Sequence, residues 1–204
     1  MEKASVAVLV SGGGTNLQAI IDAQKNGALV SGEVALVVSN NENAFALERA
    51  KNHGIKVRTV LKKNFATSAA FENAIVHELQ AAQIDIVVLA GFMSILSGEF
   101  IKKFPDRIIN IHPSLIPSFC GKGFYGLKVH EAALSYGVKI TGATVHYVNE
   151  IPDGGKIILQ KAVEVQEHDT AVVLQKRVME EAEWKILPLA LEEVCKKYLF
   201  AKNM

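Results

Sequence analysis

The stretch VAVLVSGGGTNLQAII, residues 6–21, decides the fold. It reads as an apolar strand, a turn of three glycines, and the start of an amphipathic helix. Glycines let the backbone approach a ligand closely, and the first amides of a helix have no partner within it. With Thr15 and Asn16 as side-chain donors, the turn predicts an anion site, the alternative being a tight turn without a ligand.

The kind of anion is narrowed by what the turn lacks. A dinucleotide fingerprint needs a further glycine where Leu17 stands, and an acidic residue at the end of the next strand, which reads VVSNN over 37–41. A P-loop needs a Gly-Lys-Ser/Thr sequence, which is also absent. The turn therefore indicates a single phosphate group.

Strand and helix patterns alternate along the first two thirds of the chain. Short apolar, β-branched runs predict strands at 5–10, 32–39, 55–60, 85–90 and 107–111. Helical spacing lies between or after them, at 15–26, 43–53, 68–82, 95–103 and 127–136. This alternation predicts an α/β fold with a Rossmann-like, open, mostly parallel sheet and helices on both faces.

The last third of the chain has a different texture. Two long extended runs at 139–149 and 155–165 predict a pair of later strands, which can run antiparallel to part of the sheet. Residues 169–197 have helical spacing, and Asp169 or Thr170 is the expected N-cap.

Within that last helix, Pro188 predicts a kink or a break, because proline lacks the amide hydrogen that a helix interior requires. No repeat, low-complexity tract or linker interrupts the sequence. Residues 1–204 are therefore predicted to form a single domain, and half of them are hydrophobic, as in a globular protein with a substantial core.

Charge and cysteine content limit the partners. Lys and Arg number 22 and Asp and Glu 21, so no global field favours nucleic acid or an anionic membrane. Cys120 and Cys195 form no disulfide framework and lack metal-ligand spacing. The N-terminus does not read as a signal peptide, and the longest apolar run, IDIVVLAGFM, is about half the length of a membrane helix. We expect a cytoplasmic protein.

The stretch IINIHPSLIP, residues 108–117, places two polar side chains at the end of an apolar strand. Asn110 and His112 are two positions apart, so they project from the same face, and Pro113 ends the strand. An ordinary transition from strand to loop is the alternative.

Several candidate segments follow strands that we expect to be parallel. Ligands of open α/β sheets bind at the carboxyl ends of the strands. Residues 12–16, the sequence GFMSIL at 91–96, and the pair Asn110 and His112 should therefore meet at one edge. Asp153 lies in the turn IPDGG, whose glycines would hold it in a defined pose.

A carboxamide, an imidazole and a carboxylate together suit acyl or one-carbon transfer. An amide N–H or an imidazolium can stabilise an oxyanion, and a nearby carboxylate would raise the pKa of His112 and help remove a proton. No Gly-x-Ser-x-Gly elbow is present. Cys120 is an alternative nucleophile without a particular base, and the scattered histidines show no zinc spacing.

Six segments carry a resemblance to a known family: LVSGGGTNLQAII, VVSNNENAFALERA, VVLAGFMSIL, INIHPSLIPSF, HYVNEIPDGGKIILQ and RVMEEAEWKILPLAL. In this order and spacing, from residue 5 to 192, they resemble the phosphoribosylglycinamide formyltransferases, which are folate-dependent enzymes of de novo purine synthesis. The resemblance implies a formyltransferase fold and transfer of a formyl group from 10-formyltetrahydrofolate to the amine of glycinamide ribonucleotide.

The resemblance also implies roles for individual residues. The ribonucleotide would be bound by Gly14, Thr15, Asn16 and Glu183. The folate would be bound by Met93, Ser94, Ile95, Leu96, Asn110, Asn149, Glu150 and Asp153. Asn110, His112 and Asp153 would be catalytic, and His146 would contact these side chains rather than the substrate. Direct attack by the amine is implied, with Asn110 and protonated His112 stabilising the oxyanion, and neither a metal nor a covalent enzyme intermediate.

The sequence departs from the family pattern on the folate side. Ser68 and Ser94 stand where arginines are frequent, and the loop 118–128 is longer and more polar than usual. Lys122 or Lys128 in that loop could compensate electrostatically.

Three rival functions share parts of this pattern. Formyltetrahydrofolate hydrolase uses a similar polar core but normally has an additional N-terminal domain. Methionyl-tRNA formyltransferase needs a further C-terminal domain and a basic surface. A non-catalytic sensor of a sugar phosphate or folate would not require the polar trio. The expected assembly is a monomer or a homodimer.

Overall fold

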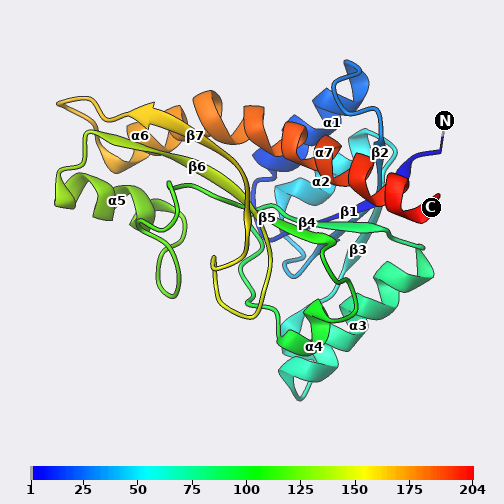
Figure 1. Cartoon of the computed structure of the whole chain (residues 1–204). Helices are drawn as coiled ribbons and strands as arrows, with labels where there is room; N and C mark the ends of the chain where they lie inside the picture. The colour runs from blue at the N-terminus through cyan, green and yellow to red at the C-terminus, as the bar shows by residue number, and fades with distance from the viewer. Residues whose placement is uncertain (1) are drawn as a thin grey trace.

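The computed structural model describes residues 2–204 (Figure 1). Seven strands form one sheet in the order β3-β2-β1-β4-β5-β6-β7. The first five strands are parallel, β6 is antiparallel to β5, and β7 is antiparallel to β6. The strands are β1 (Ala4–Val10), β2 (Gly32–Ser39), β3 (Lys56–Thr59), β4 (Ile86–Leu89), β5 (Ile108–His112), β6 (Ile140–Tyr147) and β7 (Ile157–Glu164). The predicted strands and the mostly parallel sheet are confirmed.

Helices connect the strands and cover the sheet. They are α1 (Thr15–Lys25), α2 (Phe45–Asn52), the 3₁₀ turn η1 (Lys62–Asn64), α3 (Ser68–Ala81), α4 (Gly98–Ile101), α5 (Leu127–Tyr136), α6 (Ala171–Val178), the π-helical turn η2 (Met179–Glu183) and α7 (Trp184–Lys202). In residues 2–204, none of these helices is both long and apolar enough to cross a membrane.

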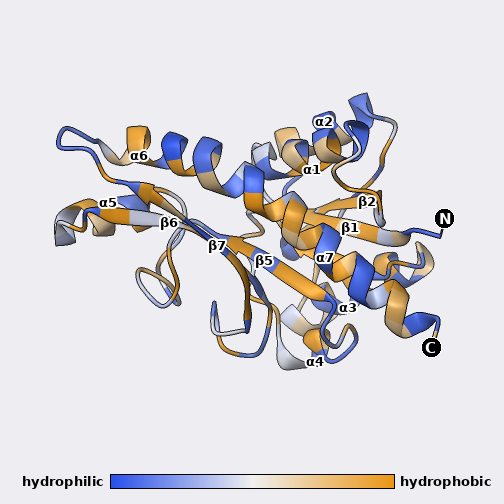
Figure 2. Cartoon of the chain, turned by 45° about the horizontal axis from the view of Figure 1, so that its top comes forward, coloured by the Kyte–Doolittle hydropathy of each residue, from blue (hydrophilic) through white to orange (hydrophobic). Residues whose placement is uncertain are grey.

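Two cores lie on opposite faces of the sheet. Because side chains alternate along a strand, Val6 and Val8 of β1 pack in one core, together with buried residues of α1, α2, α6 and α7. Ala7 and Leu9 pack in the other core, with α3 and α4. Figure 1 shows these helices on either side of the sheet, and Figure 2 shows hydrophobic colouring along the central strands and mixed colouring along α7. The prediction of helices on both faces is confirmed.

The helix predicted at 95–103 is wrong in its extent. Only the four residues of α4 are helical, because Ser97 caps the helix by accepting a hydrogen bond from the amide of Phe100. Ser97 is itself held by buried Glu72, whose carboxylate accepts bonds from both its amide and its hydroxyl. The segment before Ser97 is an irregular loop at the end of β4.

The predicted break at Pro188 is also wrong in its place. Thr170 caps α6, as expected, by accepting a bond from the amide of Val173 at 3.3 Å. The irregularity is the π-helical turn η2, upstream of the proline. Pro188 is the fifth residue of α7, and losing one hydrogen bond near the start does not end this 19-residue helix.

The sheet order determines which side chains meet. β1, β4 and β5 are neighbours and parallel, so their carboxyl ends lie at one edge. The antiparallel register of β5 and β6 then sets Asn110 opposite His146 and His112 opposite Thr144.

Candidate active site

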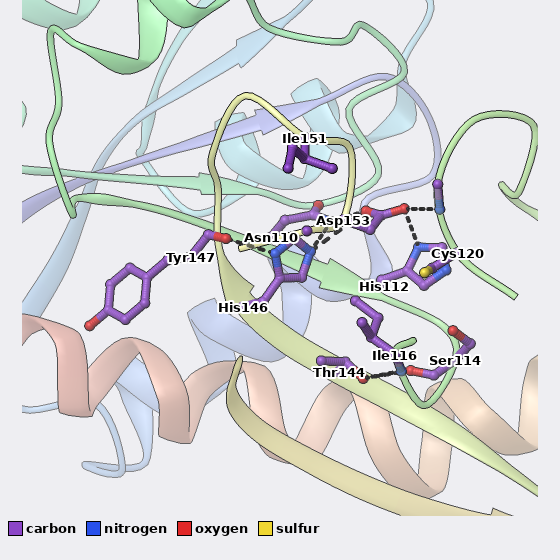
Figure 3. Close-up of polar contacts among 12 residues, drawn as sticks. Asn110, His112, Ser114, Ile116, Cys120, Thr144, His146, Tyr147, Ile151 and Asp153 are labelled. Atoms are coloured by element: carbon purple, nitrogen blue, oxygen red, sulfur yellow. Dashed lines mark hydrogen bonds and ion pairs between the residues drawn. The ribbon is translucent and has the colours of Figure 1, made fainter. Parts of the chain in front are cut away.

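The three predicted catalytic side chains lie together. Asn110 and His112 project from β5, and Asp153 reaches them from the turn between β6 and β7 (Figure 3). The Asn110 Nδ2 donates to Asp153 Oδ1 at 3.4 Å, and His112 Nδ1 lies 3.6 Å from Asp153 Oδ2. The sequence separation of about forty residues is thus closed by the fold at the expected sheet edge.

His146 orients Asn110 from the neighbouring strand. Its Nδ1 lies 2.8 Å from the carbonyl oxygen of Tyr147, which can only accept, so Nδ1 carries the hydrogen. The bare Nε2 therefore accepts from Asn110 Nδ2 at 3.1 Å. This bond fixes which end of the carboxamide faces Asp153, and it agrees with the supporting position predicted for His146.

The turn that carries Asp153 is tightly specified. Asp153 has a φ of +55°, in the left-handed region. Asn149 stabilises the turn by donating to the carbonyl of Gly154 at 3.2 Å and accepting from the amide of Ile151 at 3.0 Å. A Cβ added at Gly155 would overlap the carbonyl oxygen of Tyr147, so the turn requires a glycine there.

Burial dominates the electrostatics of the pair. It lowers the pKa of His112, and the Asp153 charge and the Phe119 carbonyl, which raise it, offset burial only in part. Asp153 thus acts in the expected direction, and burial, which the sequence does not reveal, sets the sign of the net shift. Burial also opposes ionisation of Asp153. His146 and His112, which lie 3.6 Å from its carboxylate and attract it when they are protonated, and the Gly121 amide outweigh burial and hold the pKa of the carboxyl below its usual value.

Sequence reasoning missed two backbone groups at this site. The carbonyl oxygen of Phe119 lies 2.9 Å from His112 Nε2, and the amide of Gly121 donates to Asp153 Oδ2 at 2.8 Å. The length and polarity of the loop pointed to its importance, but no residue type identifies a backbone donor or acceptor.

The glycine turn lies at the same edge, after β1. Gly14 has a φ of +72° and packs so closely on Ala46 that a Cβ would stand 2.5 Å from the Ala46 Cβ. No side chain caps the start of α1, so its first amides face outward, as the anion prediction requires. Arg49, which we did not predict, donates from Nε to the carbonyl of Gly13 at 2.9 Å and adds a positive charge beside the turn.

Asn16 and Glu183 form a buried pair across 167 positions of sequence. The Asn16 Nδ2 donates to Glu183 Oε2 at 2.6 Å, while Asn16 Oδ1 is buried without a hydrogen-bond partner. Burial raises the pKa of Glu183 to about 7, against a smaller lowering effect of the Asn16 bond. The predicted ribonucleotide residues Asn16 and Glu183 are therefore in contact. Thr15 begins α1 beside them.

The predicted folate residues fall into two groups. Met93 and Ile95 are exposed apolar side chains, as is Ile151 in the turn beside Asp153. The loop that carries the first two is held at the sheet edge, where the Met93 amide donates to Ser11 Oγ at 2.8 Å and Ser94 Oγ accepts from Asn40 at 3.1 Å.

The remaining residues that we associated with the folate differ in exposure, and only Leu96 is buried. The Leu96 side chain is buried in the core, and Glu150 lies against Gly98 at the start of α4. Lys128 donates to the hydroxyl of Tyr125 at 3.1 Å. Lys122 and Ser68, the first residue of α3, are exposed.

A cavity of about 440 Å³ opens beside the glycine turn, and Thr15, Arg49 and Trp184 are among its lining residues. The predicted trio lines neither this cavity nor a second one of about 500 Å³ around Tyr147 and Lys197. The backbone contacts of Phe119 and Gly121 lie against the trio instead. Within residues 2–204, no group of three or more His, Cys, Asp or Glu side chains is arranged to hold a metal ion.

Comparisons with known proteins agree with the geometry. The formyl transferase family model matches residues 4–191. The phosphoribosylglycinamide formyltransferase of Haemophilus influenzae is 41% identical over 187 residues, which are 92% of this chain and 85% of that protein. The human trifunctional purine biosynthetic protein adenosine-3 is 46% identical over 193 residues. The match covers 95% of this chain but only 18% of that longer protein.

Solved structures extend the likeness to three dimensions. The glycinamide ribonucleotide transformylase 1 of Symbiobacterium toebii superposes with a TM-score of 0.90 at 41% identity, over 96% of this chain and 89% of that one. The phosphoribosylglycinamide formyltransferase of Brucella melitensis gives 0.87 at 40% identity, over 95% and 96% of the two chains. The predicted family is confirmed: the chain belongs to the phosphoribosylglycinamide formyltransferases.

Proposed function

We propose that this chain transfers the formyl group of 10-formyltetrahydrofolate to the amino group of glycinamide ribonucleotide, in de novo purine synthesis, at the site formed by Asn110, His112 and Asp153. Family membership supports the reaction. The observation that carries the assignment of the site is the cluster itself: Asp153, from a distant turn, lies within 3.6 Å of both Asn110 and His112 at the sheet edge that also holds the glycine turn.

The ribonucleotide is assigned to the glycine turn. Gly14, Thr15 and Asn16 hold its phosphate, because the uncapped amides of α1 and the nearby Arg49 favour a dianion. Glu183 contacts the rest of the nucleotide, where its carboxyl accepts or donates hydrogen bonds depending on pH. One phosphate group fits a turn that lacks the dinucleotide and P-loop patterns.

The folate is assigned to the exposed apolar side chains beside the trio. Met93, Ile95 and Ile151 would lose solvent-exposed apolar surface against a planar ring, which favours binding. Ser94, Asn149 and Glu150 lie in the same two segments and supply polar groups there. Leu96 supports the loop from the core rather than contacting the ligand.

Asn110 stabilises the oxyanion that forms when the amine attacks the formyl carbon. Its bond to Asp153 is 3.4 Å long and therefore weak, so the amide hydrogen can move to a stronger acceptor as negative charge develops. His146 holds the carboxamide in place during this exchange through its 3.1 Å bond. Asn110 thus contributes a preorganised donor.

His112 moves the proton. It is neutral at rest, since burial lowers its pKa, and it takes the proton that the amine releases on forming the new C–N bond. Asp153, which stays ionised, stabilises the resulting imidazolium. The proton then passes to the folate nitrogen as its bond to the formyl carbon breaks. No proton is gained or lost overall, and no covalent bond to the protein forms.

The reaction is tested by following folate product with 10-formyltetrahydrofolate, with and without glycinamide ribonucleotide. We expect turnover only with the ribonucleotide. Asp153→Asn should lower kcat by about 10²- to 10⁴-fold, the range for a positioned acid–base group. Glu33 lies near the start of β2, whereas the candidate site lies at the carboxyl ends of the strands. Glu33→Gln is therefore the matched control, and it should retain wild-type activity.

The other outcomes identify the rivals. Turnover without the ribonucleotide, with release of formate, would assign the chain as a hydrolase. Binding of either ligand without turnover would assign a sensor. Full activity of Asp153→Asn would show that Asp153 has no part in the mechanism.

The cysteines Cys120 and Cys195 are free, which supports a reducing compartment as the place of the reaction.

A further inference from the structure

The loop between β5 and α5 brings two backbone groups to the two side chains that handle the proton. The Phe119 carbonyl oxygen lies 2.9 Å from His112 Nε2, and the Gly121 amide donates to Asp153 Oδ2 at 2.8 Å. Both are of normal hydrogen-bond length, whereas His112 Nδ1 and Asp153 Oδ2 are 3.6 Å apart. The backbone therefore bonds each member of the pair more closely than they bond each other.

The carbonyl determines the tautomer of His112. A carbonyl oxygen can only accept a hydrogen bond, so Nε2 must carry the hydrogen. In the neutral imidazole, Nδ1 is then the nitrogen with the free lone pair, and it faces Asp153. Only Nδ1 can take up a proton while the contact with Phe119 persists.

We propose that the backbone of Phe119 and Gly121 is a positioning element of the catalytic centre: it fixes His112 as the Nε2–H tautomer, so that Nδ1 is the nitrogen that exchanges the proton, and it holds Asp153 opposite that nitrogen. This inference rests on the function proposed above and adds the choice of nitrogen and the residues that enforce it.

The loop is built to hold this position. Phe119 has a φ of +49°, an unfavourable conformation for a bulky residue, which must be maintained by its surroundings. Its ring packs edge-on against Phe124 and Tyr136, with centroid distances of 6.4 and 6.0 Å. At the base of the loop, buried Ser114 donates to the carbonyl of Ser118 at 2.6 Å.

The two backbone groups also favour the charged pair. A carbonyl next to His112 stabilises its imidazolium and raises the pKa, whereas an amide next to Asp153 stabilises its carboxylate and lowers the pKa. Burial acts against both charges. The loop therefore supplies, through its backbone, part of the stabilisation that water would give to an exposed pair.

The tautomer is tested directly by long-range ¹H–¹⁵N spectra of the histidine side chains at pH 8. The His112 signals are assigned by their loss in His112→Asn. We expect the pattern of a protonated Nε2 and a bare Nδ1. A protonated Nδ1, donating to Asp153, would overturn the proposal.

The amide contact is tested with two matched glycine variants. Gly121 and Gly123 have φ values of +86° and +97°, and a Cβ at either position has no heavy atom within 4 Å. Alanine therefore introduces similar backbone strain in the same loop, but only Gly121 donates to Asp153. We expect Gly121→Ala to lower kcat by about 10- to 100-fold, with Gly123→Ala close to wild type.

The pH profile separates positioning from general damage to the loop. Two groups shape the acidic side of the kcat profile: His112, which must be neutral, and Asp153, which must be ionised and titrates at lower pH. The strain of Gly121→Ala displaces the amide from Asp153 and so raises the pKa of that carboxyl, and the lower-pH part of the acidic limb should move to higher pH in Gly121→Ala alone. Equal losses in both variants, or an unmoved limb, would overturn the proposal while leaving the reaction intact. Absence of transfer in the wild-type enzyme would instead refute the proposed function.

Discussion

Replacing Glu183 by glutamine should stabilise the folded protein and weaken its binding of the ribonucleotide. Glu183 is buried in η2 and accepts a bond from Asn16 Nδ2 at 2.6 Å. Glutamine has nearly the same shape and keeps an oxygen for that bond, but it has no charge to desolvate. The substitution therefore removes the cost of ionisation in the ligand-free protein and, at the same time, the carboxylate that the nucleotide would use.

The magnitude follows from the pKa. Burial raises the pKa of Glu183 from 4.5 to about 7, and each pH unit corresponds to 1.36 kcal/mol, which gives about 3 kcal/mol. Between these two values the native state holds a proton that the unfolded chain has released, so the free energy of unfolding falls as pH rises. Above pH 7 the whole cost is present, and below 4.5 it is absent.

Urea unfolding at pH 4.5, 6 and 8 measures this dependence. Relative to wild type, Glu183→Gln should gain about 3 kcal/mol at pH 8, about half of that at pH 6, and little at pH 4.5. Glu181→Gln, an exposed neighbour in the same turn, is the control and should change none of these values. A gain that is equal at all three pH values, or a loss at pH 8, would refute the reasoning. The KM for the ribonucleotide should rise in Glu183→Gln alone.

Three further predictions concern the turn, the folate wall and the proton acceptor. Gly155→Ala should cost about 1–3 kcal/mol in urea unfolding and displace Asp153, because its Cβ would overlap the Tyr147 carbonyl; unchanged stability would contradict this. Ile95→Asp should raise the KM for the folate about tenfold without lowering the Tm, since this side chain is 70% exposed in the free protein. Because burial lowers the pKa of His112, kcat/KM for the folate should fall with a midpoint below pH 6.5 when the ribonucleotide is saturating, so that titration of Glu183 does not contribute. A fall centred above 6.5 would count against a neutral His112 as acceptor.

The strands could be predicted because parallel strands buried on both faces are nearly continuous apolar runs. β2 has the predicted bounds, and β1 differs by one residue. The helix predicted at 95–103 was too long because the apolar residues of this segment serve two purposes. Leu96 and Phe100 are core residues, while Ile95 is exposed beside the candidate site. Periodicity cannot distinguish a short helix from a loop whose apolar side chains face different environments.

The side chains of the site could be predicted to the extent that strand order follows from the pattern. Asn110 and His112 had to share a face, and parallel neighbours had to end at one edge. The sign of the His112 pKa shift could not be predicted, because it depends on how far burial exceeds the effect of Asp153, and burial follows from the loop packed against it.

The loop backbone at the site marks the limit of sequence reasoning. Every residue carries the same amide and carbonyl, so a sequence identifies which side chains can act but not which backbone groups point at them. The contacts of Phe119 and Gly121 depend on dihedral angles in the left-handed region, which glycine permits at one position and aromatic packing enforces at the other. Loop sequence can therefore differ between related enzymes while the same hydrogen bonds are made, provided that a residue free to adopt such angles remains at the position that faces the carboxylate.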